Sequence, residues 1–163
     1  MKKIITLAAT IVLAFATQAA SFKWTAANVY GVSGTKFDGA ATLYAYAASA
    51  DASTASVVDT GTIVAGVVKD GTTVGKTFSN DALTSGTSYN FYFVIEDAGK
   101  TFTSDVRSAT GADVGSATIG FGSLATATQN ANNWKSSGDV PEPTTGLLVL
   151  LGMAGLALKR KVA

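Results

Sequence analysis

The chain has 163 residues, with 12 basic and 11 acidic side chains, a formal net charge of +1, and neither histidine nor cysteine. The lack of those two residue types excludes histidine bases and metal ligands, cysteine nucleophiles and a disulfide framework. Five of the basic residues lie in the first three and last five positions. The part between them is nearly neutral and has no electrostatic footprint for nucleic acid.

The first 20 residues have the organisation of a secretory signal peptide. Lys2 and Lys3 precede an apolar segment from Ile4 to Phe15, and small residues follow up to Ala19 and Ala20. Cleavage after Ala19 places Thr17 and Ala19, both small, at positions −3 and −1, and is favoured over cleavage after Ala20. We therefore expect export by the general secretion machinery and removal of the signal peptide, assigned to residues 1–20, by signal peptidase with cleavage at Ala19 or Ala20.

Residues 21–124 have a β pattern throughout. Short apolar stretches alternate with turns rich in Gly, Asp, Ser and Thr, and no 12-residue window has helical periodicity. The pair Asp70-Gly71 favours a type I′ hairpin turn. Strands are expected over Phe22–Tyr30, Ala41–Ala47, Ser88–Glu96, Lys100–Val106 and Ser116–Leu124. The predicted fold class is all-β, a single β-sandwich-like passenger domain flanked by the signal peptide and a C-terminal single transmembrane helix.

The strongest predicted strand is Ser88–Glu96, in which four apolar residues recur at every second position: Tyr89, Phe91, Phe93 and Ile95. Side chains two apart share one face of a strand, so this face is expected at the centre of the core.

Just before this strand, Leu83, Gly86 and Tyr89 resemble the tyrosine corner of fibronectin type III modules. Ser85 stands where the proline of that motif usually lies. The resemblance implies that the Tyr89 hydroxyl bonds back to upstream backbone.

Residues 125–139 are small and polar and are interpreted as a linker. Trp134 is the exception within it. Two roles are open for this side chain: it folds back onto the domain, or it sits at a membrane–water interface, a depth that Trp favours.

The chain ends in a three-part segment, residues 140–163. Pro141, Glu142 and Pro143 form a stiff, extended motif, because each proline fixes its own φ and restricts the residue before it. The apolar run 144–158 is predicted as a transmembrane helix of roughly 22 Å, short against a hydrocarbon core of roughly 30 Å. The basic tail 159–163 carries the membrane stop signal, Lys159, Arg160 and Lys161, which holds that end in the cytoplasm.

This order of motif, apolar run and basic tail resembles the PEP-CTERM sorting signal of exported bacterial proteins. The resemblance implies recognition of residues 141–143 by an exosortase-like membrane protease. It also implies transient anchoring in the inner membrane with the passenger in the periplasm, followed by delivery to the cell surface or the extracellular space. A plain membrane tail anchor is the alternative.

For the passenger we expect a structural or interaction protein of the surface or extracellular matrix, with no enzymatic activity, cofactor or metal. The alternative is a secreted carbohydrate-binding module associated with extracellular polysaccharide, in which Tyr44 and Tyr46, or Trp24, form a sugar-stacking platform. Exposed coplanar rings would support that module, and buried rings would argue against it.

The carboxylates give little support to other chemistry. Glu96 and Asp97 are the only adjacent acids, and neighbours in a strand point to opposite faces, whereas a glycosidase needs two carboxylates across one cleft. Four aspartates are expected in loops, where oxygen ligands for Ca²⁺ are common, but they lack the spacing of a calcium loop: Asp51, Asp59, Asp70 and Asp81.

Overall fold

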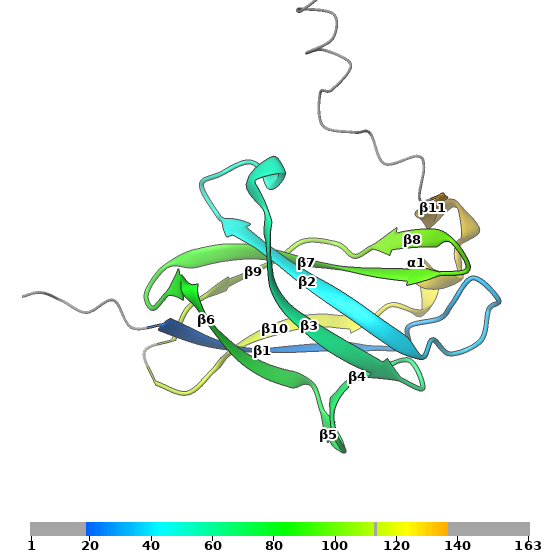
Figure 1. Ribbon diagram of the computed structural model, residues 1–163, viewed down its shortest axis with the longest axis horizontal. Coiled ribbons are helices and arrows are strands. Elements are labelled where there is room, and N and C mark those ends of the chain that lie inside the picture. Colours follow the sequence, from blue (N-terminus) through cyan, green and yellow to red (C-terminus); the bar gives the residue numbers. More distant parts are fainter. Residues whose placement is uncertain (1–18, 113, 137–163) are drawn as a thin grey trace, which may run out of the picture.

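The computed structural model describes residues 19–112 and 114–136. The strands in chain order are β1 (Ala19–Ala27), β2 (Gly39–Ala47), β3 (Ser56–Val64), β4 (Val67–Asp70), β5 (Thr73–Val74), β6 (Lys76–Thr84), β7 (Ser88–Asp97), β8 (Lys100–Thr103), β9 (Arg107–Thr110), β10 (Ala117–Ser123) and β11 (Trp134–Ser136). The helical segments are short: η1 (Ala52–Thr54), α1 (Ala125–Gln129) and η2 (Ala131–Asn133) (Figure 1). The described part of the chain is therefore all-β in class, as predicted.

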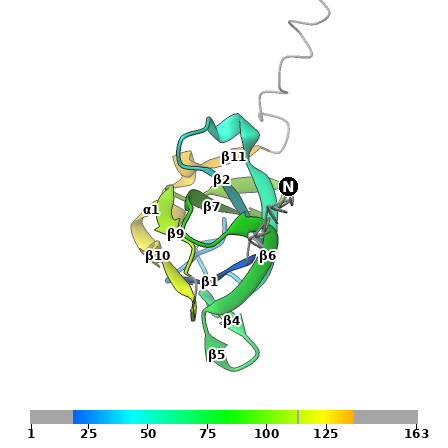
Figure 2. The same cartoon turned by 90° about the vertical axis from the view of Figure 1, so that its left-hand side faces the viewer.

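The strands form two sheets. The smaller has the order β10-β1-β6, with β1 parallel to β10 and antiparallel to β6. The larger has the order β11-β8-β7-β2-β3-β4-β5, and β9 also pairs with β7. Seen along the long axis, the strands enclose a common interior, and the β4–β5 hairpin projects from it (Figure 2).

The core lies between the two sheets and is rich in aromatic residues. Residues alternate between buried and half-buried along β1, β2 and β7. The ring centroids of Phe22 and Phe91 are 5.0 Å apart, and those of Trp24 and Phe93 are 5.8 Å apart, so β1 packs on β7. Burying each such ring stabilises the fold by about 1.5–3 kcal/mol. The predicted inward face of Ser88–Glu96 is confirmed, since all four of its apolar residues are buried.

Two hairpins of the larger sheet have two-residue turns with both residues at positive φ, as type I′ turns require. These residues are Ala65 and Gly66 between β3 and β4, and Ala98 and Gly99 between β7 and β8. The predicted turn at Asp70-Gly71 is wrong by one position. Asp70 is the last residue of β4 and pairs with Thr73, so the turn residues are 71 and 72.

The expected tyrosine-corner contact is present. The Tyr89 hydroxyl accepts a hydrogen bond of 3.0 Å from the backbone N–H of Thr84, and Leu83 beside it is buried. Gly86 adopts a φ of 75°, which a side chain would disfavour. The corner closes the β6–β7 connection at the point where the chain passes from one sheet to the other.

The linker prediction for residues 125–139 is wrong for its described part, up to Ser136. α1 and η2 bring the chain back to the larger sheet, and β11 pairs antiparallel with β8. Trp134 is 6% exposed, lies against Phe102 at 5.7 Å between ring centroids, and donates its indole N–H to the carbonyl of Thr128. The polar composition hid this segment because a single large apolar side chain supplies its burial.

Candidate functional site

The outward face of the larger sheet carries a cluster of tyrosines. The alternation in β2 turns Leu43 and Ala45 inward and leaves Tyr44 half-buried on the outside, as the sequence predicts for that strand. Tyr44 lies opposite Tyr92 of β7, and their rings stack at 5.1 Å between centroids with an interplanar angle of 5°. A stacked aromatic pair of this kind contributes about 0.5–1.5 kcal/mol beyond area burial.

Tyr46 follows on the same face of β2, opposite Asn90. Burial raises the pKa of Tyr92, and the nearby hydroxyls of Tyr44 and Tyr46 raise it further. Tyr44 and Tyr46 therefore lie close enough to Tyr92 to disfavour its ionised form. Sequence reasoning missed Tyr92, although the alternation that places Phe91 and Phe93 inward also places Tyr92 outward.

An apolar band continues from this cluster on both sides. Val57 of β3 lies opposite Tyr44 and is 53% exposed. Val106, between β8 and β9, is 46% exposed and lines the same cavity as Tyr92. Next to this band, Thr42, Val94 and Thr103 are neighbours across three strands: Thr42 opposite Val94, and Val94 opposite Thr103. The face thus combines exposed apolar surface with two threonine hydroxyls, one on each side of Val94.

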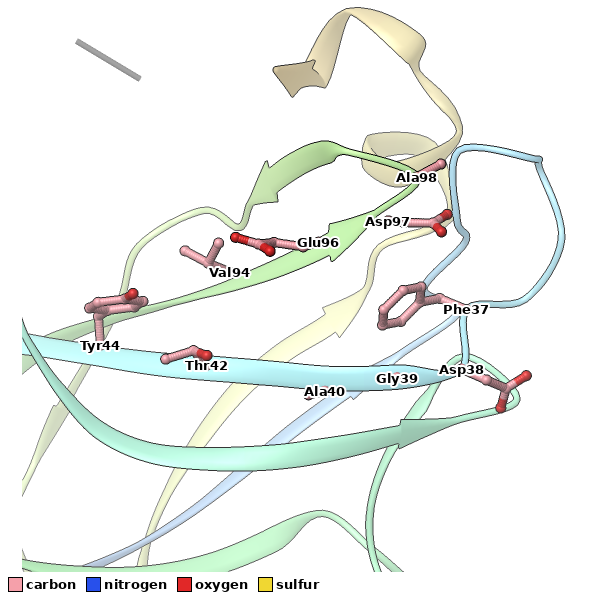
Figure 3. A pocket seen from close by; sticks show the side chains of 10 residues that line it. All are labelled: Phe37, Asp38, Gly39, Ala40, Thr42, Tyr44, Val94, Glu96, Asp97 and Ala98. Atoms are coloured by element: carbon pink, nitrogen blue, oxygen red, sulfur yellow. The ribbon is translucent and has the colours of Figure 1, made fainter. Parts of the chain in front are cut away.

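Two shallow cavities make this face concave. One, of about 550 Å³, is lined by Tyr44, Tyr92, Val94, Glu96 and Val106 together with Ala52, Thr101, Thr103 and Ser104. The other, of about 350 Å³, shares three of those residues: Tyr44, Val94 and Glu96. The two cavities therefore adjoin and form one groove along β2 and β7, which we call the tyrosine groove. Figure 3 shows Tyr44 and Thr42 of β2 facing the same space as Val94 and Glu96 of β7.

The charges along the tyrosine groove are all carboxylates. Its lining includes Glu96, Asp97 and Asp38, and neither cavity is lined by lysine or arginine. Asp97 accepts a hydrogen bond from the N–H of Val32 at 2.7 Å, and Asp38 accepts one from the N–H of Ala65 at 2.6 Å. Glu96 is exposed and makes no side-chain hydrogen bond to the described residues, so its carboxylate faces solvent over the groove.

Trp24 cannot serve as a sugar-stacking residue, so that part of the carbohydrate alternative is wrong. Its side chain is fully buried, and its indole N–H donates to Asp59 at 2.9 Å. Lys76 donates to the other Asp59 oxygen at 2.7 Å. Trp24 thus anchors the core, and its buried polar atom is satisfied through Asp59.

The aspartates considered for calcium do not converge. Only Asp51 lies in a loop, where its carboxylate caps η1 through the N–H of Ser53. Asp59, Asp70 and Asp81 are in β3, β4 and β6, contrary to the loop prediction, because strand pairing extends further than the turn residues indicated. Among residues 19–112 and 114–136, no group of acidic side chains is placed to hold a metal ion.

The predicted processing residues lie at or beyond the ends of the described chain. Ala19 and Ala20 begin β1; Ala20 is fully buried, whereas Ala19 is half-buried. The sorting motif 141–143, the apolar run 144–158 and the basic tail 159–163 lie outside the described residues. The described part of the chain contains no helix long and apolar enough to cross a membrane.

Comparison with known families identifies the C-terminal segment. Residues 139–161 match the family model of the PEP-CTERM protein-sorting motif. Comparisons with curated proteins and with solved structures found no match, and the likeness to fibronectin type III modules is not confirmed.

This match indicates an exported protein that carries a C-terminal sorting signal. More particularly, its residues 139–161 carry the PEP-CTERM protein-sorting motif, the kind that an exosortase-type membrane enzyme recognises.

Proposed function

We propose that this protein is a component of the cell surface or extracellular matrix, and that its β domain acts by binding rather than by catalysis. The observation that carries the proposal is the sorting motif at residues 139–161. In this scheme signal peptidase removes the leader and residues 144–158 hold the chain in the inner membrane. The exosortase then cuts at or near residues 141–143 and releases the domain.

The folded C-terminal segment supports this scheme. β11 ends at Ser136 and is held on β8 by the burial of Trp134. Only residues 137–140 separate it from Pro141. A cut at the motif therefore removes no residue of the two sheets, and the domain keeps its complete core after release.

The side-chain inventory supports binding over catalysis. The chain has no histidine or cysteine to act as base or nucleophile. Glu96 lies over the tyrosine groove, whereas the Asp97 carboxylate is engaged by the N–H of Val32. This is unlike the paired carboxylates that face one another across a glycosidase cleft.

The proposal is tested by separating recognition of the motif from anchoring. Glu142→Ala leaves the apolar run and the basic tail unchanged, so we expect normal export and membrane insertion. Because the variant lacks the one charge of the extended motif, we expect it to accumulate uncut in the membrane fraction of a host that carries the enzyme.

Asp139→Ala is the matched control, since it removes a neighbouring carboxylate outside residues 141–143. It should be processed like the native chain. Processing is measured as the intact mass of the protein in the cell-envelope and extracellular fractions. Equal processing of Glu142→Ala and the native chain would show that the enzyme does not recognise Glu142.

A second candidate function is a carbohydrate-binding module, and the half-exposed Tyr44–Tyr92 pair favours it. The rings are parallel but stacked on one another rather than side by side, so each ring has only its outer side and edges available to a ligand. Tyr44 and Tyr46 lie on the outer face as the alternative requires, with Tyr92 added and Trp24 excluded.

A further inference from the structure

We propose that the tyrosine groove binds an uncharged polysaccharide chain, with the chain lying along β2 and β7. This inference rests on the proposed function, because it assigns a partner to the surface that the released domain would present. It adds the chemical class of the ligand and the residues that select it.

The shape of the groove suits an extended polymer. It runs along β2 from Tyr44 to Gly39, where Phe37 lines its far end beside the β7–β8 turn. At about 3.4 Å per residue this distance is roughly 17 Å, enough for a few sugar rings. Its cavities are shallow and open rather than enclosed. A chain can therefore enter from the side, as binding within a long polymer requires.

The lining suits the two kinds of surface that a sugar ring presents. Tyr44, Tyr92, Val94 and Val106 offer apolar surface to the C–H groups of the ring. Thr42, Thr101 and Thr103 offer hydroxyls, and the Glu96 carboxylate accepts hydrogen bonds from sugar hydroxyls. Pockets that bind small molecules combine apolar surface with a few polar groups in this way.

The charge of the lining selects against acidic polymers. Three carboxylates and no cation line the groove, so a polymer of uronic acids or sulfated sugars would meet repulsion and no compensating ion pair. Lys69 and Lys76 line a different cavity next to the β4–β5 hairpin. Lys135 lies opposite Thr101 and Lys100 opposite Asp97, so both flank the groove but do not line it. The groove therefore favours uncharged sugar units.

The test uses the processed mature protein and extracellular polysaccharide from the producing cells, separated by anion exchange into uncharged and acidic fractions. Binding is measured by affinity electrophoresis in gels that contain one fraction each, at low and high salt. We expect retardation by the uncharged fraction only, and little change with salt, because contacts without ion pairs are weakly screened.

Two substitutions locate the site. Tyr44→Ala removes the ring that both cavities share, and we expect binding to weaken by about tenfold or more, the ratio that corresponds to about 1.4 kcal/mol. Thr103→Arg places a long side chain in the groove from an exposed position and should abolish retardation without touching the core. Thr77→Arg, at an exposed position in β6 of the other sheet, is its matched control and should bind like the native protein.

Retardation by the acidic fraction alone, or by neither fraction, would overturn the inference. So would unchanged binding in a folded Thr103→Arg variant. These outcomes differ from a failure of the proposed function, which would appear as an uncut chain in the membrane whatever the isolated domain binds.

Discussion

Replacing Trp134 with alanine tests whether residues 125–136 belong to the folded domain. The Trp134 side chain is 6% exposed, contacts Phe102, and donates a hydrogen bond of 2.8 Å to the Thr128 carbonyl. Trp→Ala substitutions in a core typically destabilise by about 3–5 kcal/mol. Because the free energy of unfolding of a small domain is about 5–15 kcal/mol, this loss would be a large share of the total stability.

The assay is urea unfolding of the mature chain, followed by fluorescence and circular dichroism, with thermal melting beside it. We expect a loss of about 3–5 kcal/mol and a melting temperature lower by more than about 10 °C. Lys135→Ala, next to Trp134 but exposed, should change stability by no more than about 0.5 kcal/mol. A Trp134→Ala variant as stable as the Lys135→Ala control would refute the assignment of this segment to the core.

Two further predictions concern the tyrosine groove and the membrane stop. The pKa of Tyr92 is raised in the folded protein, so at alkaline pH the folded protein keeps the phenol proton of Tyr92 that the unfolded chain has released. The stability that Tyr92 contributes is therefore complete below about pH 10 and is lost as the pH rises further. Tyr92→Phe should therefore lose less stability than the native protein across that range in urea unfolding; identical pH profiles would contradict the cause given. Changing the three cations of the basic tail, Lys159, Arg160 and Lys161, to Gln should weaken membrane retention in cell fractionation, because the apolar run is short. Unchanged retention would mean that the apolar run anchors the chain without the basic tail.

Where alternation was strong, the sequence predicted the structure well. The period-two pattern of Ser88–Glu96 placed Phe91 and Phe93 in the core, and the pattern of Ala41–Ala47 placed Tyr44 outside. Both follow from local geometry, because side chains alternate across a strand whatever lies next to it. Sheet order did not follow from the pattern. The parallel pairing of β1 with β10 joins segments far apart in the chain, and no local signal predicts it.

The candidate site was only partly visible for the same reason. Tyr44 and Tyr46 stood out as neighbours in one strand, but the groove also needs Tyr92 and Val106, which the pairing of β7 with β2 and the β8–β9 connection bring beside them. Trp24 was placed in a plausible strand, yet whether it faced water depended on which sheet would cover it. The segment before the sorting motif was misjudged because the burial of Trp134 comes from a distant strand, β8.

The start of β1 bears on where the leader is removed. Ala20 is fully buried and packs beside Gly111, where even a Cβ atom would come within 2.7 Å of it. Cleavage after Ala19 keeps this contact in the mature chain, whereas cleavage after Ala20 removes it. Cleavage after Ala19 stays a prediction; it would remove the first residue of β1 and keep the contact of Ala20 with Gly111.

Sorting at residues 141–143 is tested most directly by the intact mass of the native protein, recovered from the cell surface or the medium of a host that carries the processing enzyme. Sorting at the motif predicts one mature chain that begins at Ala20 and ends between Val140 and Thr144. A finished protein that still carries Val162 and Ala163 at its C-terminus would contradict sorting at the motif and leave the C-terminal segment as a membrane anchor alone.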